Sequence, residues 1–575
     1  MSEIIFYSRF FGRSTKTTSL KSKIKSHQLL VQAGYIRESV AGRYYFLPLG
    51  QRLQLKVMNL IRQEMNKAGA LEMLSPVLHP LSLWQETNRD QATGFELMQL
   101  KDRRNTAFAL GGTAEEMFVD VVRKFNLSYK DLPINIYQFG LKFRDELRAR
   151  GGLLRVREFI MKDAYSFSTQ EQFKAVYQQM AEVYTTIFKR LGLTTKMVDA
   201  DGGYIGGDYC HEFVVDSPVG ESAYFFTQDG YLAHEDIAVF NKELPPSSEK
   251  LQTLEKVSAE RGPTMADSFK CHQPVPLNQH IKNVVYLNEK QEIILACLRG
   301  DLEVNETKLK KASNCHQLTP LTNQQIKDWL DSEAGFISAV GLKAQSKDHP
   351  LVIVADDSIL VLKNAISGAN QLNFDYININ YDRDFKAQII SDIALAKDGY
   401  LSLSGQTLIQ AQGIEVGNIF QLGYHYSDKM KGAEYADQKG VLQKYYMGCY
   451  GIGIGRTIAT MAEVLSDDQG LIWPLDVSPF HIYVIDLIGN QEAQTIIKDL
   501  AENQNWEILY DDRQDVSAGQ KLNNADLLGL PLRVIISPKT LKSEALEIKC
   551  RSNQKVELVK LNKAAEYINQ YLFSA

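Results

Sequence analysis

An arginine-rich stretch at residues 143–159, FRDELRARGGLLRVREF, is the first segment whose residues could bind a charged ligand. Counted from Lys142 to Lys162 inclusive, it holds seven basic and three acidic residues. A guanidinium group is planar and permanently charged, so it binds phosphate through paired hydrogen bonds. Arginines that alternate along a short antiparallel strand pair therefore predict a phosphate-binding face. A solvated, charged surface strand explains the same pattern equally well.

A glycine-rich segment at residues 448–457, GCYGIGIGRT, is the second candidate. Its glycines let a backbone pass close to a flat ligand. Arg456 falls at the predicted start of a helix, where free backbone N–H groups favour anions. Tight packing of the glycines against neighbouring backbone is the alternative explanation. The segment does not follow the GxxxxGK[ST] pattern of a phosphate-binding loop, and no Rossmann pattern follows it.

Regular elements are predicted around both segments. Residues 50–68 predict an amphipathic helix, because apolar residues recur at every fourth position. These residues are Leu53, Val57, Ile61 and Met65. The apolar run 70–77 predicts a strand that ends at a proline. Residues 133–147 and 153–167 predict two strands, and the glycine-containing loop between them predicts an antiparallel pair.

The composition of the chain shifts after about residue 224, which indicates several domains for this length. The proline-containing segment 242–256 predicts a connection. A mixed segment follows, which predicts an α+β domain. Its strand-like runs are 283–287, 293–298, 351–354 and 359–361. Prolines at 474 and 479 predict a linker, after which short apolar strands alternate with helical stretches, as in one small α/β domain.

The overall composition excludes several classes of protein. The 575 residues carry a net charge of −5 and are 44% hydrophobic, so the chain can bury several cores and is not basic over its whole surface. The six cysteines form no CxxC pair, so we expect neither a disulfide framework nor a structural zinc site. No segment resembles a signal peptide or a membrane span. These features predict a soluble, cytoplasmic protein.

Three of these segments resemble the motifs of class II aminoacyl-tRNA synthetases. The helix and strand that end at Pro76 are similar to motif 1. The element of Phe143, Arg144 and Glu146 resembles motif 2, and the glycine-rich segment that ends at Arg456 resembles motif 3. Further segments, in order over essentially the whole chain, narrow the resemblance to the bacterial-type prolyl-tRNA synthetase family. They are SHQLLVQAG (26–34), GRYYFLPLG (42–50), GGTAEE (111–116), KFRDELR (142–148), REFIMKDAYSF (157–167), IGGDYCHEF (205–213), GIEVGNIFQLG (413–423) and MGCYGIGIGR (447–456).

The resemblance implies an α/β multidomain fold. Residues 1–224 and 406–474 are expected to form the catalytic domain, a class II antiparallel sheet core flanked by helices. Residues 225–405 resemble an inserted α+β editing domain, through LRGDLEVNETKL (298–309), SGAN (367–370) and INYDRDF (379–385). Residues 475–575 resemble an α/β anticodon-binding domain, through the run that begins at Asp511.

The family's reaction implies the partners and the ATP site. The carboxylate of L-proline attacks the α-phosphate of ATP, and a ribose hydroxyl of tRNA(Pro) then takes the prolyl group. Because the nucleophile is already ionised, the enzyme needs positioning and charge stabilisation more than a base. By motif position, the catalytic residues are expected to be Arg144, Arg456 and Glu146. The expected ATP-binding residues are Arg144, Glu146, Arg155, Phe159, Glu415, Asn418 and Arg456. Magnesium is expected to be carried with ATP, with no other metal, and the family implies a homodimer.

The family's Thr-x-Glu element implies the proline site. Thr113 and Glu115 suit the secondary ammonium of proline, although Glu115 also fits an ordinary carboxylate at a helix N-terminus. The full expected set is Thr113, Glu115, Arg144, Phe159, Met161, His211 and Phe420. Each aromatic residue, and His211, is equally compatible with a place in a core. Cys449 matches a family cysteine near the site and is interpreted as packing, not as a nucleophile.

Two accessory sites are also implied. The predicted editing residues are Gly368, Gln279 and Asp375, although the last two stand where the family pattern leads us to expect a lysine and a histidine. Hydrolysis of alanyl-tRNA(Pro) would remove a product that the proline pocket cannot exclude. A small difference in apolar size between two amino acids yields only about 1–3 kcal/mol of discrimination. The predicted tRNA contacts are Arg513, Lys549 and Arg551. Solvated surface cations are the alternative for these three.

Two rival functions compete with this one. A different class IIa synthetase, such as the threonyl or glycyl enzyme, is disfavoured by the Thr-x-Glu element and the mid-chain insertion. A synthetase-like regulatory or tRNA-binding protein without catalysis is disfavoured because Arg144 and Arg456 are both present.

Overall fold

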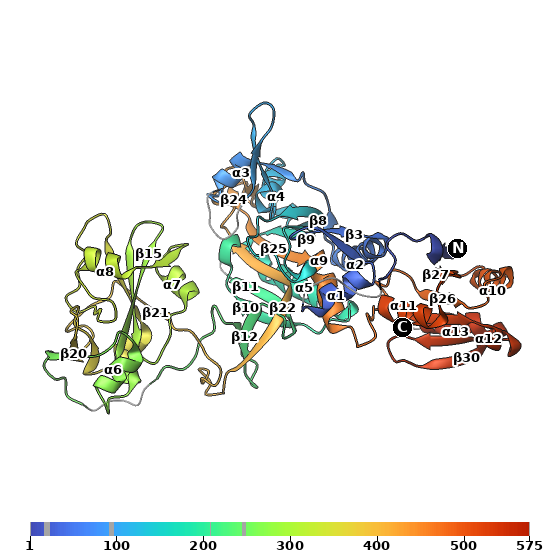
Figure 1. The fold of residues 1–575 in the computed structure, drawn as a ribbon. Coiled ribbons are helices and arrows are strands. Elements are labelled where there is room, and N and C mark those ends of the chain that lie inside the picture. The colour runs from blue at the N-terminus through green and yellow to red at the C-terminus, as the bar shows by residue number, and fades with distance from the viewer. Residues whose placement is uncertain (1, 16–22, 91–96, 208, 244–248, 574–575) are drawn as a thin grey trace. The chain divides into compact units, whose positions relative to one another are not determined.

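The computed structural model describes residues 2–15, 23–90, 97–207, 209–243 and 249–573 (Figure 1). The chain folds into two compact units. The first comprises residues 1–197, 202–221 and 413–575, and the second comprises residues 198–201 and 222–412. The second unit therefore interrupts the first in sequence, as expected for an insertion.

An antiparallel sheet forms the centre of the first unit. It is part of a nine-stranded sheet, and six of its strands, in spatial order, are β4 (Leu71–Glu72), β8 (Ile134–Phe143), β9 (Glu158–Ser168), β25 (Tyr446–Gly453), β22 (Ile409–Gly423) and β11 (Tyr209–Asp216). All neighbours are antiparallel except β4 and β8. The predicted antiparallel pair of β8 and β9 is confirmed. β9 begins later than predicted because residues 152–154 form a 3-10 turn, and the strand predicted over residues 70–77 is only Leu71–Glu72.

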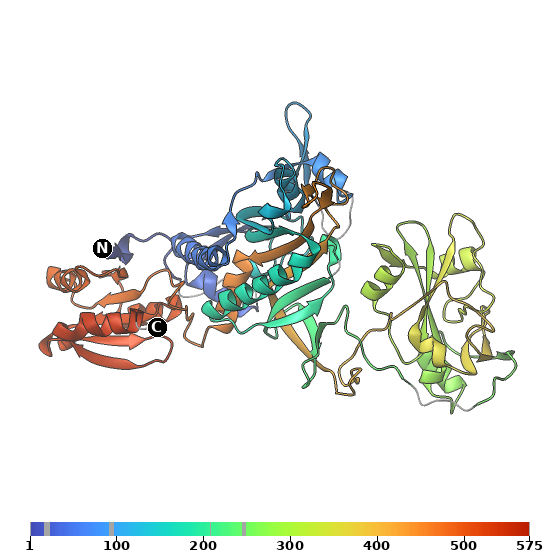
Figure 2. The same cartoon turned by 180° about the vertical axis from the view of Figure 1, so that it is seen from behind.

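Three helices cover one face of this sheet (Figure 2). They are α2 (Pro48–Lys67), α5 (Gln170–Arg190) and α9 (Ile454–Val464). The helix predicted over residues 50–68 is confirmed, and its N-terminal proline loses no hydrogen bond at that position. A capping box of Thr169 and Gln172 starts α5. Arg456 lies in the first turn of α9, as predicted.

The opposite face of the sheet carries α4 (Glu115–Val122), whose Phe118 ring lies 4.4 Å from that of Tyr165 on β9, measured between centroids. Shorter elements complete this part of the unit. They are α1 (Lys25–Gln32), β2 (Ile36–Val40), β3 (Arg43–Phe46), β5 (Leu78–Pro80), α3 (Leu81–Glu86), β6 (Gln99–Lys101), β7 (Ala107–Leu110), β23 (Glu434–Ala436) and β24 (Leu442–Lys444). The face covered by α2, α5 and α9 thus forms the hydrophobic core. The face that carries α4 is where a site can form.

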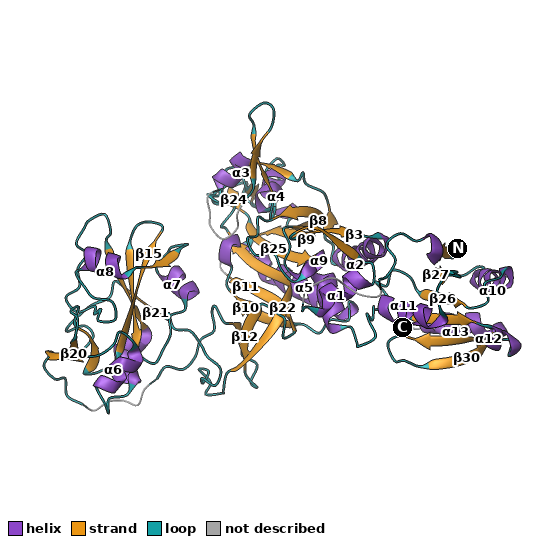
Figure 3. Ribbon diagram, viewed as in Figure 1, coloured by secondary structure: helices purple, strands orange, loops and turns teal. Residues whose placement is uncertain are grey.

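The C-terminal part of the first unit is a six-stranded sheet with helices (Figure 3). Its strands, in spatial order, are β1 (Glu3–Phe6), β27 (Glu507–Asp511), β26 (Ile482–Asp486), β28 (Leu532–Ile536), β29 (Ala545–Cys550) and β30 (Val556–Lys560). The helices are α10 (Gln491–Ala501), α11 (Ala518–Leu528), α12 (Pro538–Lys542) and α13 (Leu561–Phe573). The N-terminal strand β1 pairs in parallel with β27, so this sheet is not built from residues 475–575 alone.

The second unit is an α+β structure. Its five-stranded sheet contains β17 (Leu318–Pro320), β15 (Ile281–Asn288), β16 (Ile293–Arg299), β18 (Leu351–Asp356) and β21 (Ile389–Ser391). A second sheet contains β14 (Glu255–Ser258), β20 (Phe374–Ile379) and β19 (Ala365–Gly368). Its helices are α6 (Met265–Cys271), α7 (Glu306–Ala312) and α8 (Asn323–Leu330). The strands β10 (Lys196–Ala200), β13 (Leu232–His234) and β12 (Ser222–Phe226) belong to the nine-stranded sheet. The strand predicted over residues 359–361 is wrong, because Asp357–Val361 is a 3-10 helix.

The helices show how the chain distributes its apolar residues. The two longest described helices, α5 with 21 residues and α2 with 20, are both amphipathic. Within the described part of the chain, no helix combines the length and the apolar composition that crossing a membrane requires.

Candidate active site

Strand register places several predicted residues on one face of the central sheet. Successive side chains of a strand point to opposite faces, whereas residues paired across strands share a face. Three cross-strand rows follow: Met161 with Gly453; Asp163 with Gly451 and Asn418; Tyr165 with Cys449 and Phe420. Phe159 shares their face by alternation along β9. An added Cβ on Gly451 would come within 3.0 Å of the Asn418 side-chain oxygen, so glycine keeps this part of the face open.

A buried acidic cluster lies at the start of α4, on the same face. The Thr113 hydroxyl donates to Glu115 Oε1 at 2.7 Å, and the Cys449 thiol donates to the same oxygen at 3.3 Å. Arg89 Nη1 lies 3.2 Å from Glu115 Oε2 and 2.8 Å from Glu116 Oε1. The side chains of both glutamates are fully buried, and that of Arg89 is 5% exposed.

Two carboxylates of this cluster, Glu115 and Glu116, share one guanidinium, that of Arg89. Arg144 also interacts electrostatically with Glu115, and Lys429 with Glu116. The neighbouring Lys142 and Asp163 neutralise each other at 2.9 Å. Burial raises the pKa of Glu116, as expected where a charge is desolvated. The buried Glu115 carboxylate, beside the Thr113 hydroxyl, is suited to bind a cationic group.

Tyr165 connects this cluster to the sheet. Its hydroxyl accepts the backbone N–H of Ala114 at 2.9 Å and donates to Asp163 Oδ2 at 3.0 Å. Sequence reasoning missed Arg89, Asp163 and Tyr165. For Asp163 and Tyr165 a signal was available, because both stand at even spacing from Phe159 along one predicted strand. No comparable signal marked Arg89.

Arg144, directly after β8, bonds to the segment that precedes α4. Its Nε donates to the backbone carbonyl of Gly112 at 3.2 Å, next to Thr113. Its guanidinium carbon lies 5.4 Å from the centroid of the Phe159 ring, in cation–π geometry. The structure thus brings Arg144, Phe159 and Thr113 together, as expected for residues that contact one small substrate.

The other predicted ATP-binding residues form two ion-paired groups. Glu146 pairs with Arg155 at 2.8 Å. Glu415 pairs with Arg456 at 2.9 Å and accepts from Asn418 Nδ2 at 3.0 Å. Both groups have side chains that are partly exposed. Cations and carboxylates in these positions are accessible to a charged ligand.

His211 departs from the prediction. It pairs across strands with Ile419, one residue before Phe420, and therefore points to the opposite face of the sheet. Its Nδ1 lies 2.8 Å from the hydroxyl of Tyr177 on α5, and its Nε2 lies 2.9 Å from the hydroxyl of Tyr209. The prediction that His211 shares the site of Phe420 was wrong, because the register of β11 directs it toward α5.

Cys449 is on the site face and behaves as packing. Burial and the adjacent Glu115 raise the pKa of its thiol well above the usual value. A protonated thiol is a weak nucleophile. The structure is consistent with the interpretation that Cys449 supports Glu115 without reacting.

The three cations predicted to contact tRNA are used inside the C-terminal part. Arg513 forms a two-bond pair with Asp511, at 2.7 and 2.8 Å, and its side chain is 5% exposed. Lys549 pairs with Asp526 at 3.0 Å, and Arg551 with an aspartate of the segment before β26 at 2.6 Å. The alternative of solvated surface cations was wrong for these residues, because internal carboxylates hold them, and their contact with tRNA stays a prediction.

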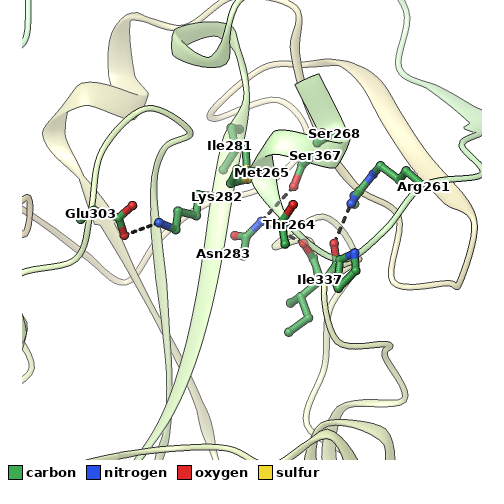
Figure 4. Close-up of a pocket in the computed structure, with 13 residues that line it drawn as sticks. Arg261, Thr264, Met265, Ser268, Ile281, Lys282, Asn283, Glu303, Ile337 and Ser367 are labelled. Atoms are coloured by element: carbon green, nitrogen blue, oxygen red, sulfur yellow. Dashed lines mark hydrogen bonds and ion pairs between the residues drawn. The ribbon is translucent and has the colours of Figure 1, made fainter. Parts of the chain in front are cut away.

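The second unit contains a cavity of about 420 Å³ (Figure 4). Its lining is formed by Arg261, Pro263, Thr264, Met265, Ser268, Ile281, Lys282, Asn283, Glu303, Gly335, Ile337, Ser367 and Gly368. Gly368 is thus the one predicted editing residue in the lining. Gln279 lies in a 3-10 turn, and Asp375 is fully buried in an ion pair with Arg261. Lys282, which sequence reasoning missed, supplies a cationic group to the wall.

The chain is similar to known proteins over nearly all of its length. A model of the tRNA synthetase class II core domain (G, H, P, S and T) matches residues 96–465, and an anticodon binding domain model matches residues 481–571. The proline--tRNA ligase of Dehalococcoides mccartyi (strain ATCC BAA-2266 / KCTC 15142 / 195) is 40% identical over 570 residues, 98% of both chains. The proline--tRNA ligase 1 of Bacillus thuringiensis subsp. konkukian (strain 97-27) is 40% identical over 98% of this chain and 99% of its own.

Solved structures share the fold. The prolyl-tRNA synthetase of Cryptosporidium parvum, complexed with L-proline and AMP, matches 96% of this chain and 75% of its own, with a TM-score of 0.56 and 12% identity. The Giardia lamblia prolyl-tRNA synthetase, in complex with prolyl-adenylate, has a TM-score of 0.55 and 16% identity over 93% of this chain and 73% of its own. At these identities the likeness shows the fold alone.

Proposed function

This chain belongs to the proline--tRNA ligase family of class II aminoacyl-tRNA synthetases, and we propose from that premise how its residues activate proline. The observation that carries the proposal is the acidic cluster around Glu115, which is buried and in which two carboxylates share one guanidinium. The secondary ammonium of proline is the cationic group that suits this cluster. The rival synthetases named above are disfavoured by the relatives' specificity as well.

Proline is oriented by groups on both sides of its ring. Its ammonium binds Glu115 and the Thr113 hydroxyl, which already bond to each other at 2.7 Å. Its carboxylate is directed to Arg144, whose Nε holds the carbonyl of the residue before Thr113. Met161, Phe159 and Phe420 share the same sheet face and bound the apolar ring.

The chemistry then needs placement more than proton transfer. A proline carboxylate oxygen attacks the α-phosphorus of ATP, and pyrophosphate leaves. A ribose hydroxyl of tRNA(Pro) later attacks the prolyl carbonyl, and AMP leaves. Arg144 and Arg456 stabilise the charge that develops on the phosphates, and such preorganised groups account for a large part of rate acceleration.

The ion-paired groups beside this face are the proposed ATP contacts. Glu146 with Arg155, and Glu415 with Arg456, exchange their internal partners for ATP groups when the nucleotide binds. Glu415 and Asn418 offer carboxylate and amide oxygens, the donor types that Mg²⁺ prefers, so these residues fit a magnesium ion carried with ATP. Bound there, the ion would neutralise polyphosphate charge.

The cavity of the second unit favours a second, hydrolytic function. A polar cavity of about 420 Å³ in an inserted domain has the size of a small-ligand site. We assign it to hydrolysis of alanyl-tRNA(Pro), the error that a proline-sized pocket cannot exclude. Purified chain and alanyl-tRNA(Pro) should release alanine faster than the tRNA alone, and an unchanged rate would remove this function.

We also infer a homodimer that buries the motif 1 region. Leu71, Leu74 and Leu78, at or beside the sheet-edge strand β4, are 66%, 74% and 42% exposed. Exposed apolar clusters of this kind mark interaction sites. Light scattering should give twice the mass of 65.0 kDa, and Leu74→Glu should lower it. A monomeric parent chain would contradict the inference.

ATP–pyrophosphate exchange tests the main proposal. The purified chain is assayed with each of the twenty amino acids, and Arg144→Ala serves as the control. We expect strong exchange with proline, weak exchange with alanine, and loss of exchange in the variant. Exchange with another amino acid alone would overturn the proposed pocket, and no exchange at all would point to the non-catalytic rival.

A further inference from the structure

A serine and a histidine meet at the wall of the cavity in the second unit. Ser268 of α6 lines the cavity (Figure 4). Its Oγ lies 3.0 Å from Nδ1 of His280. His280 precedes β15, is fully buried and is absent from the lining. Ser268 thus stands between the imidazole and the cavity, which is the order that a nucleophile and its base require.

The protonation of His280 can be read from its partners. Its Nε2 lies 3.3 Å from the backbone carbonyl of Val275, and a carbonyl only accepts. The proton of the neutral ring is therefore on Nε2, so Nδ1 is the acceptor and the Ser268 hydroxyl is the donor. Burial lowers the pKa of His280 below its usual value, which favours the neutral ring whose Nδ1 accepts from Ser268.

A neighbouring charged group fixes the helix that carries Ser268. His272, directly after α6, bonds through Nε2 to Asp375 Oδ2 at 2.7 Å. Arg261 holds the same aspartate through two bonds of 2.7 Å. The His272 and His280 rings lie 6.1 Å apart between centroids. Asp375 thus anchors the end of α6 and leaves His280 free to face Ser268.

We propose that Ser268 and His280 form the nucleophile and base that hydrolyse an aminoacyl ester in this cavity. The proposal rests on the editing function proposed above. Asp375 stands where a histidine was expected, and the proposal supplies an imidazole from His280 instead, behind Ser268 and beside the 3-10 turn that holds Gln279.

The proposed hydrolysis has two steps: the aminoacyl group moves to Ser268, and water then releases it. Ser268 Oγ attacks the ester carbonyl carbon while its proton moves to His280 Nδ1. The bond to the ribose oxygen breaks, that oxygen takes the proton from His280, and the aminoacyl group remains on Ser268 as an ester. Water then attacks this ester, His280 accepts a proton from the water, and that proton returns to Ser268 Oγ as the amino acid leaves.

Ser268→Ala, measured with alanyl-tRNA(Pro), tests the hydrolysis. We expect its deacylation rate to fall at least about 100-fold, the scale of a lost nucleophile or base. Ser313→Ala is the matched control, because Ser313 is a buried serine of the same unit that donates to the Leu309 carbonyl and is absent from the cavity lining. Thermal unfolding of both variants checks that they are folded.

A second measurement needs no variant. A fluorophosphonate probe, which reacts with activated serines, is added to the parent chain, and the modified peptide is identified by mass spectrometry. We expect modification at Ser268. No modification there, or a Ser268→Ala rate within threefold of the parent rate, would overturn the dyad. Modification of Ser268 in a chain that leaves alanyl-tRNA(Pro) intact would support the dyad and remove the editing function instead.

Discussion

In the sheet unit, Glu115 and Glu116 share one guanidinium, that of Arg89, whereas in the inserted unit a single carboxylate, Asp375, receives both Arg261 and His272. All three carboxylates are fully buried. A buried carboxylate with two basic partners of its own holds structure together, and two buried carboxylates that share one basic partner are arranged for a ligand that brings positive charge. The comparison separates a binding site from a structural anchor when both have the same residue types.

Glu115→Gln should break the ligand side of this comparison and has the largest expected effect. It removes the negative charge that binds the proline ammonium, and losing one partner of a buried ion pair costs about 2–5 kcal/mol. We expect kcat/KM for proline in pyrophosphate exchange to fall about 300-fold at the middle of that range.

Glu116→Gln is the matched control, because Glu116 bonds to Arg89 and Thr87 one residue further along α4. Its expected loss is about tenfold, the lower end of the scale of a hydrogen bond to a charged group, about 1.5 kcal/mol. Equal losses in the two variants would show that the site depends on total charge and not on the position of Glu115.

Asp375→Asn should break the structural side. It leaves Arg261 buried without its counter-charge, and removing one partner of such a pair typically costs about 3 kcal/mol. We expect the inserted unit to unfold earlier in urea, followed through Trp329, which is stacked on His349 with ring centroids 4.0 Å apart. Proline-dependent exchange is measured in parallel, and an unshifted urea midpoint would contradict the anchoring role.

Lowering the pH should destabilise the folded protein through His79, whose ring lies against Gly111, two residues before Thr113. Burial, followed by nearby Lys142, lowers the pKa of His79 to about 4 from 6.5. Because the unfolded chain binds this proton more tightly than the folded protein does, the free energy of unfolding is unaffected above pH 6.5 and falls as the pH is lowered toward 4. At pH 5 the free energy of unfolding should be lower by about 2 kcal/mol. His79→Gln should remove this part of the pH dependence, and an unchanged dependence would exclude His79 as its source.

The smallest expected effect concerns two cysteines. Cys449 in the sheet unit is buried and donates to Glu115, whereas Cys271 in the inserted unit is exposed. We expect iodoacetamide to modify Cys271 first, and Cys449→Ser to change exchange by less than about tenfold, since it alters one weak hydrogen bond. Rapid alkylation of Cys449, or loss of exchange in Cys449→Ser, would assign it a chemical role.

Local sequence signals predicted the elements that carry the site. The alternation in residues 157–167 and the glycine-containing loop before it specify β9 and its antiparallel partner, because both signals are contained in one short window. Thr113 and Glu115 stand two residues apart, so their proximity needs no tertiary information. For these residues the predicted positions agree with the geometry, although their roles stay proposals.

Non-local pairing accounts for the failures. Whether His211 faces the site or α5 depends on a one-residue register between β11 and β22, which lie about two hundred positions apart in the chain. Arg551 counted as a free cation in the sequence, yet its partner Asp467 lies 84 residues earlier. The charge of a segment says how many cations it has, but only the fold says which of them are already paired.

The parallel pairing of β1 with β27 makes the C-terminal sheet a product of both ends of the chain. The hydroxyl of Ser2 adds bonds to the carbonyls of Ala501 and Gln504. An excised C-terminal fragment would therefore present β27 as an open edge, which is prone to aggregation. The amino-terminal strand therefore closes the edge of a sheet that the other end of the chain builds. Moving this C-terminal part into another protein, or fusing a bulky partner to the first residue, has to preserve the pairing of β1 with β27.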